Sequence, residues 1–83
     1  HEGTINEAPV YPRLIVETAL RYQANSVILA HNHPGGSLQP SNADINITKK
    51  ISVALEAISI NVVDHIIVAG DKYMSFAEKG LIG

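Results

Sequence analysis

The sequence predicts an α/β (α+β) domain in which helices pack against a mixed β-sheet. Two continuous apolar runs, 26–30 and 61–69, are typical of buried strands. Two other segments, 13–23 and 41–58, repeat their apolar residues at helical spacing. Strands and helices that alternate in this way favour a sheet with helices packed against it. At 83 residues and 8.9 kDa, the chain has the length of a single small domain, residues 1–83.

The first helix is expected to begin near Pro12, because a proline suits the first helical turn, where its missing N–H is not needed. On the other side from its apolar face, Glu17 and Arg21 are four residues apart and are expected to form an ion pair. The apolar face is expected to contain Ile15, Val16, Ala19 and Leu20.

The second half of the chain continues the alternation. The strand 26–30 runs into a stretch with two prolines and two glycines, 34–40, which predicts a loop. Ser41 opens the second helix, and the strand 61–69 is followed by a short turn and a hairpin partner, 72–76. The apolar stripe of this helix is expected to contain Ile47, Ile51, Ala54, Leu55 and Ile58.

Composition excludes several classes of protein. The chain has no cysteine, so disulfides, thiolate nucleophiles and cysteine-ligated metal sites are ruled out. Six scattered cations and a net charge of −2 argue against direct nucleic-acid binding. No apolar run approaches the ~18 residues that cross a membrane. We therefore expect a cytoplasmic protein whose metal, if it binds one, is held by His, Asp and Glu.

A candidate metal site follows the first strand. His31 and His33 are two residues apart at a strand end, so their side chains point to the same face. Asp44 lies in the first turn of the next helix, where the helix dipole favours an ionised carboxylate. Two neutral histidines and one aspartate suit zinc, and three protein ligands leave the open position of a catalytic site.

A purely structural interpretation competes with this one. Ser41 and Asp44 have the Ser-x-x-acid spacing of a capping box, in which the aspartate only satisfies a backbone N–H at the helix start. The combination of converging histidines, a Pro/Gly turn and a carboxylate at a helix start favours the metal site.

The same residues resemble a known motif. His31, His33, Pro34, Ser41 and Asp44 match the pattern H-x-H-P-x6-S-x2-D of JAMM (MPN+) zinc metalloproteases. Across essentially the whole chain the sequence resembles the RadC family, the bacterial JAB-like branch. The segments that carry this wider resemblance are Gly3–Asn6, Tyr11–Arg13, His31–Gly36, Pro40–Asp44, Asp64–Val68 and Ser75–Gly80.

The resemblance implies a curved, mostly antiparallel sheet flanked by helices, similar to cytidine deaminases. It implies Zn²⁺ held by His31, His33 and Asp44, and it implies that Ser41 stabilises the oxyanion of the reaction. The expected activity is that of a metallopeptidase or isopeptidase acting on a peptide or protein substrate, with homo-oligomers possible. One alternative is a non-catalytic zinc-binding interaction module. Another is a protein associated with DNA repair whose nucleic-acid contacts lie outside this chain.

The resemblance also requires a glutamate as general acid/base upstream of the Gly3–Thr4 pair. That position would precede His1, so we expect the chain to be the C-terminal part of a longer domain that has further strands upstream. Glu2 is the nearest carboxylate and serves as the candidate if the register slips. Glu7 is interpreted as a solvated loop charge.

Three residues near the end of the chain have competing interpretations. Asp64 interrupts an apolar strand, either as a carboxylate that orients a ligating histidine or as a polar group paired within the fold. We favour the second role. Tyr73 and Phe76 are interpreted as core aromatics rather than as a stacking platform for a single nucleic-acid strand.

Overall fold

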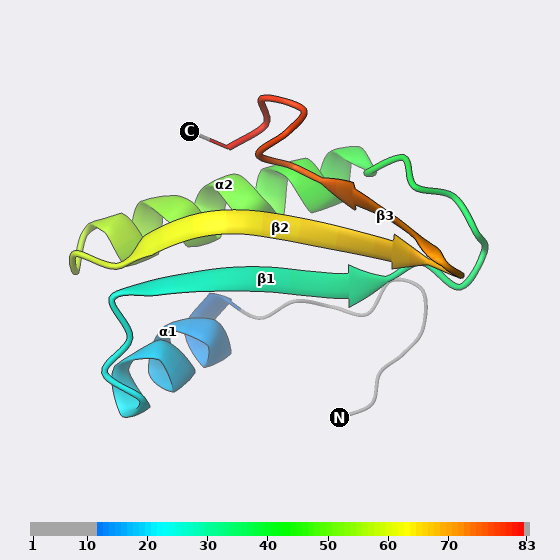
Figure 1. Ribbon diagram of the computed structural model, residues 1–83. Helices are drawn as coiled ribbons and strands as arrows, with labels where there is room; N and C mark the ends of the chain where they lie inside the picture. Colours follow the sequence, from blue (N-terminus) through cyan, green and yellow to red (C-terminus); the bar gives the residue numbers. More distant parts are fainter. Residues whose placement is uncertain (1–11, 83) are drawn as a thin grey trace.

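A computed structural model describes residues 12–82, and its element order confirms the predicted alternation (Figure 1). Gly3–Asn6, Glu2 and Glu7 lie outside the described residues. The elements are α1 (Pro12–Arg21), β1 (Ser26–Asn32), α2 (Asn42–Glu56), β2 (Asn61–Ala69) and β3 (Lys72–Ser75).

The three strands form a mixed, open sheet in the order β1-β2-β3, which confirms the α+β class. The first two strands are parallel because α2 connects them, whereas β2 and β3 form an antiparallel hairpin through a tight turn. The carboxyl end of β1 therefore lies beside the carboxyl half of β2, and His31 is the register partner of Ile67.

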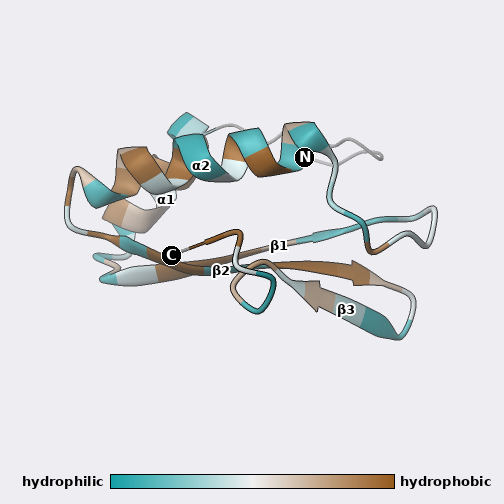
Figure 2. Cartoon of the chain, turned by 90° about the horizontal axis from the view of Figure 1, so that it is seen from above, coloured by the Kyte–Doolittle hydropathy of each residue, from teal (hydrophilic) through white to brown (hydrophobic). Residues whose placement is uncertain are grey.

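Both helices cover the same face of the sheet (Figure 2). One group of buried residues lies between α1, α2 and the sheet, and a second lies beneath β3. Within α1, Ala19 is buried but Leu20 is 54% exposed, so the buried apolar face of this helix is narrower than predicted. The ion pair on this helix joins Arg13 to Glu17 at 3.2 Å rather than the predicted Glu17 to Arg21. The buried apolar side chains are Ala19, Ile51, Leu55, Ile60, Val62, Ile67, Ala69, Met74 and Phe76.

A β-bulge in β2 changes which residues face the helices. Val27 pairs with Val62, but the next residue of β1, Ile28, pairs with Asp64, so Val63 is the extra residue. Strict alternation along β2 would place Val62 and His65 on opposite faces. Because of the bulge, both are buried on the helix side.

Both helices end in the same hydrogen-bond pattern, two residues earlier than predicted. At the end of α2, the Ile60 N–H donates to Leu55 O (2.9 Å) and the Ser59 N–H donates to Glu56 O (3.0 Å). These are the two bonds of a Schellman motif, and Ser59 has the left-handed φ of 64° that the motif needs. Gln23, with φ of 54°, has the same conformation after α1.

The opposite face of the sheet is exposed over the described residues and includes several apolar side chains. Phe76 is fully buried, as expected, but Tyr73 is 59% exposed on this face, so its assignment to the core was wrong. No helix within residues 12–82 has the length and apolar character needed to cross a membrane. The large apolar side chains that are exposed on this face are Ile28, Val63, Val68 and Tyr73.

Candidate metal centre

The structure brings the three predicted ligands together where β1 ends and α2 begins. His31 is the penultimate residue of β1, His33 follows the strand directly, and Asp44 lies in the first turn of α2. The two Nε2 atoms are 2.8 Å apart, and they lie 3.6 Å (His31) and 3.4 Å (His33) from the Asp44 carboxylate oxygens. Donors about 2 Å from a shared zinc ion are at most about 4 Å apart, so this spacing fits one ion.

The capping box and the ligand geometry involve the same carboxylate. The Ser41 N–H donates to Asp44 Oδ2 at 2.8 Å, and the Asp44 N–H donates to Ser41 Oγ at 3.0 Å. Burial acts to raise the pKa of Asp44, but it is outweighed by the hydrogen bonds with Ser41 together with the electrostatic interactions with the neighbouring histidines. The pKa of Asp44 therefore lies below its usual value. The two interpretations of Asp44 are compatible, because the cap holds the carboxylate ionised and turned toward the histidines.

His33 is oriented by the loop that follows it. Its Nδ1 lies 2.8 Å from the backbone carbonyl of Ser37, which can only accept a hydrogen bond. Nδ1 therefore carries a proton, so the lone pair available for a metal is on Nε2, the atom that faces the Asp44 carboxylate. This is the form in which histidine binds metal.

His31 is oriented by a third histidine that we did not predict to lie near the site. Its Nδ1 is 2.8 Å from Nε2 of His65 on β2. Burial lowers the pKa of His31, and the charge of Asp44 only partly opposes this. Burial, followed by the neighbouring His31, lowers the pKa of His65 to about 4, so His65 is neutral at neutral pH.

Asp64 does not orient a ligating histidine, and its favoured interpretation as a polar group paired within the fold is correct. Its carboxylate accepts hydrogen bonds from the backbone N–H of His65 (2.7 Å), the Ser75 hydroxyl (2.6 Å) and the backbone N–H of Ala77 (2.9 Å). The sequence clue to His65 was its position as a histidine inside an apolar strand. Its direction could not be predicted by strand alternation, because the bulge at Val63 changes which residues share a face.

The cluster of metal-ligand residues found within 12–82 consists of His31, His33 and Asp44 and contains no glutamate. Ser41 is exposed and lies at the helix start beside Asp44. Glu2, the other residue predicted to act in catalysis, lies outside the described residues.

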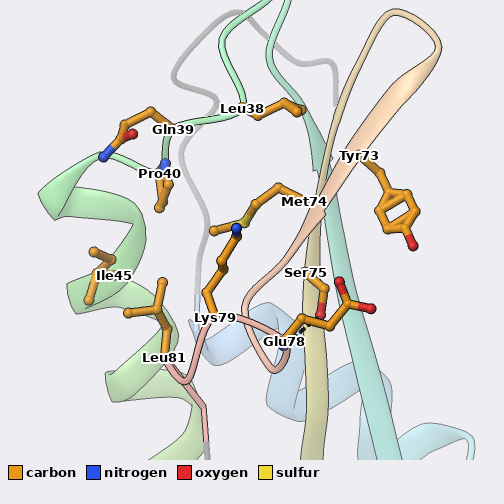
Figure 3. A pocket seen from close by; sticks show the side chains of 10 residues that line it. All are labelled: Leu38, Gln39, Pro40, Ile45, Tyr73, Met74, Ser75, Glu78, Lys79 and Leu81. Carbon is orange, nitrogen blue, oxygen red and sulfur yellow. Dashed lines mark hydrogen bonds between the residues drawn. The ribbon is translucent and has the colours of Figure 1, made fainter.

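A hollow of about 570 Å³ is lined in part by the loop between His33 and Ser41, through Leu38, Gln39 and Pro40 (Figure 3). One side comes from this loop and the start of α2, and the other comes from β3 and the turn after it. Met74 and Lys79 extend into the space between the two sides, whereas Tyr73 points away. The wall is mainly apolar and includes Leu38, Pro40, Ile45, Met74 and Leu81.

Comparisons with known proteins agree with the geometry. The family model described as "RadC-like JAB domain" matches residues 1–81. A UPF0758 protein of Pseudoalteromonas translucida is 58% identical over 80 residues, which are 96% of this chain. UPF0758 proteins of Bordetella avium and Aliivibrio fischeri are 54% and 51% identical over 96% and 98% of the chain. The chain spans 36% of the length of each of these relatives.

Proposed function

Because the chain belongs to the RadC-like JAB domain family, we propose that it is the zinc-binding part of a hydrolase, a metallopeptidase or isopeptidase. JAB domains include metalloproteases, and the motif that they share is present here as His31, His33 and Asp44. The names of the relatives, UPF0758 proteins, state no activity.

The observation that carries the proposal is a group of electron-pair donors that face one another. His33 Nε2 lies 3.4 Å from an ionised carboxylate oxygen of Asp44, and a second imidazole nitrogen, Nε2 of His31, lies 2.8 Å from it. Atoms rich in negative charge repel one another unless a cation lies between them. Two neutral imidazoles and one ionised carboxylate form a donor set that suits zinc.

A bound zinc ion would supply a Lewis acid and a water molecule whose pKa is lowered to about 7. The chain's own residues position this chemistry. Ser41 Oγ accepts the Asp44 N–H, so the hydroxyl proton is left to donate to negative charge that develops on a substrate oxygen. The general acid/base is a carboxylate outside residues 12–82, with Glu2 as the candidate in this chain.

We propose a peptide or protein substrate, in keeping with the mostly apolar hollow beside the 34–40 loop. Its volume of about 570 Å³ falls in the range of ligand pockets, roughly 300–1,000 Å³. Leu38 and Pro40 offer an apolar surface for a substrate side chain, and Lys79 offers one positive charge.

The second candidate is a zinc-binding interaction module without turnover. In this candidate, His31, His33 and Asp44 bind zinc and no carboxylate acts as a general acid/base. For a DNA-repair role, we propose that the contacts with nucleic acid lie outside this chain. Such contacts normally come from a clustered basic face, and the cations of this chain are scattered.

The proposal is tested by measuring metal content, zinc affinity and cleavage of peptide and isopeptide substrates with the full chain. We expect one zinc ion per chain, and we expect cleavage that a chelator abolishes and added zinc restores. Asp44→Asn keeps an oxygen for the Ser41 N–H but removes the ligand charge, so it should lose both zinc and activity.

Asp71→Asn is the matched control, because Asp71 is exposed in the turn between β2 and β3. It should keep zinc and activity at the wild-type level. Wild-type protein that binds zinc but cleaves no substrate would replace the hydrolase with the interaction module. Wild-type protein that binds no zinc would overturn both.

A further inference from the structure

Two polar side chains are buried behind the candidate metal centre. Thr48 on α2 is 2% exposed and His65 on β2 is 3% exposed, and Thr48 Oγ1 lies 2.7 Å from His65 Nδ1. Buried polar groups are costly unless they are hydrogen-bonded, so this pair needs a structural or functional reason. The ring of His65 also stacks on Phe76 with centroids 4.5 Å apart, which fixes its orientation.

Hydrogen bonds link Thr48 to His65 and His65 to His31, and the donor and acceptor in each are fixed by the contact that Thr48 makes with Asp44. Thr48 Oγ1 lies 2.7 Å from the backbone carbonyl of Asp44, and a carbonyl can only accept, so the threonine proton is donated there. Thr48 Oγ1 must then accept from His65 Nδ1, which leaves the lone pair of His65 on Nε2. That lone pair in turn accepts the Nδ1 proton of His31, 2.8 Å away.

We infer that His65, held by Thr48, is the positioning residue that keeps His31 in the Nδ1–H form and presents its Nε2 lone pair to the metal. This inference rests on the proposed zinc site and adds residues outside the motif that defines it. Groups that accept the second N–H of a ligating histidine commonly fix its tautomer and its orientation. A carboxylate or a carbonyl usually has this role, whereas here it belongs to a neutral histidine.

The link also connects the elements that carry the ligands. Asp44 and Thr48 are one helical turn apart on α2, His65 is on β2 and His31 is on β1. The ring of His31 and the start of α2 are therefore held by the same buried pair. Loss of this pair should weaken metal binding through the tautomer and position of His31, with the exposed surface unchanged.

The opposite hydrogen-bond direction makes a different, measurable prediction. If the Thr48 proton went to His65, His31 would be protonated on Nε2 and would donate to His33 across their 2.8 Å contact. ¹⁵N NMR of the imidazole rings distinguishes the two forms in zinc-free protein. We expect the Nδ1–H form for His31 and for His65.

The second measurement is zinc affinity by chelator competition in four variants. Thr48→Val removes the acceptor for His65, and His65→Phe removes the acceptor for His31 but keeps a ring to stack on Phe76. We expect His65→Phe to weaken zinc binding about 10–100-fold, the usual effect of losing such a partner. Thr48→Val should weaken it less, with His31 now in a mixture of tautomers.

Thr48→Ser keeps the hydroxyl and should restore both affinity and tautomer to near wild type. Thr18→Val, an exposed threonine on α1, is the matched control and should change neither. Circular dichroism in EDTA checks that each variant folds, and Thr48→Val carries the test if His65→Phe does not. Unchanged zinc affinity in a folded Thr48→Val or His65→Phe, or Nε2–H on His31, would overturn the inference. Wild-type protein that binds no zinc would overturn the site itself, while the tautomer measurement would still judge the hydrogen-bond chain.

Discussion

Replacing Asp64 by asparagine should lower the free energy of unfolding by about 2 kcal/mol at neutral pH. The carboxylate accepts three hydrogen bonds, from the adjacent backbone N–H of His65 on β2, the hydroxyl of Ser75 on β3 and the backbone N–H of Ala77 after β3. Hydrogen bonds to a charged group contribute roughly 1.5–3 kcal/mol each. Asparagine keeps one acceptor oxygen and Asp64 is partly exposed, so only part of this sum should be lost.

The effect should depend on pH in a defined direction. Burial acts to raise the pKa of Asp64, but the hydrogen bonds from Ser75 and from two backbone N–H groups outweigh it and lower the pKa below its usual 3.8. A carboxylate whose pKa is lower in the folded than in the unfolded state stabilises the fold at pH values above its pKa in the unfolded state. Its contribution is lost as the pH falls through the folded pKa. The gap between wild type and Asp64→Asn should therefore narrow in acid.

Urea unfolding followed by circular dichroism, from neutral pH down to about pH 2, measures this gap. Asp71→Asn, in the exposed turn between β2 and β3, is the control and should follow the wild type throughout. A gap that stays constant across the pH range would refute the reasoning, because it would show that the lost stability does not depend on the ionised carboxylate. No gap at neutral pH would show that water replaces the three hydrogen bonds.

Three further predictions follow from single residues. Burial, and then His31, lowers the pKa of His65 from 6.5 to about 4. The contribution of neutral His65 to the free energy of unfolding, measured in EDTA, should therefore be fully present above pH 6.5. It should fall by about 3 kcal/mol as the pH drops toward 4, because the unfolded chain takes up the proton first, and His65→Phe should reduce this loss in urea titrations. Ser59→Gly should raise the free energy of unfolding by about 0.5–1 kcal/mol, since glycine adopts the left-handed φ of 64° without strain; a lower value would contradict this. Ser41→Ala removes the acceptor for the Asp44 N–H and should cost about 1 kcal/mol in thermal or urea unfolding, whereas an unchanged stability would show that the cap is replaced by water.

The order of elements and the ligand set could be predicted from the sequence because both depend on short-range spacing. His31 and His33 are two residues apart at a strand end, and Asp44 begins a helix, so each side chain has a direction that local geometry fixes. The predicted strand 61–69 has the bounds of β2 for the same reason, because most of its residues are apolar and a glycine follows it.

The remaining differences come from features that no single residue type marks. The bulge at Val63 depends on pairing with β1, so alternation along β2 alone would place Val62 and His65 on opposite faces, although both are buried on the helix side. The helices end at left-handed residues that are Gln23 and Ser59, where a glycine would have indicated the boundary. The bulge is thus set by strand pairing, and the helix ends lack the residue type that would mark them in the sequence.

The position of the ligands shows why the 34–40 loop need not be rigid to form the centre. His31 is fixed by β1 and its bond to His65, and Asp44 is fixed by its cap with Ser41 at the start of α2. The relative position of β1 and α2 is set by β2, which pairs with the first and packs beneath the second through the contact of His65 with Thr48. Of the three ligands, His33 alone depends on the loop, through the Ser37 carbonyl. Changes in the loop should therefore act on zinc through His33, whereas changes in the buried pair should act through His31.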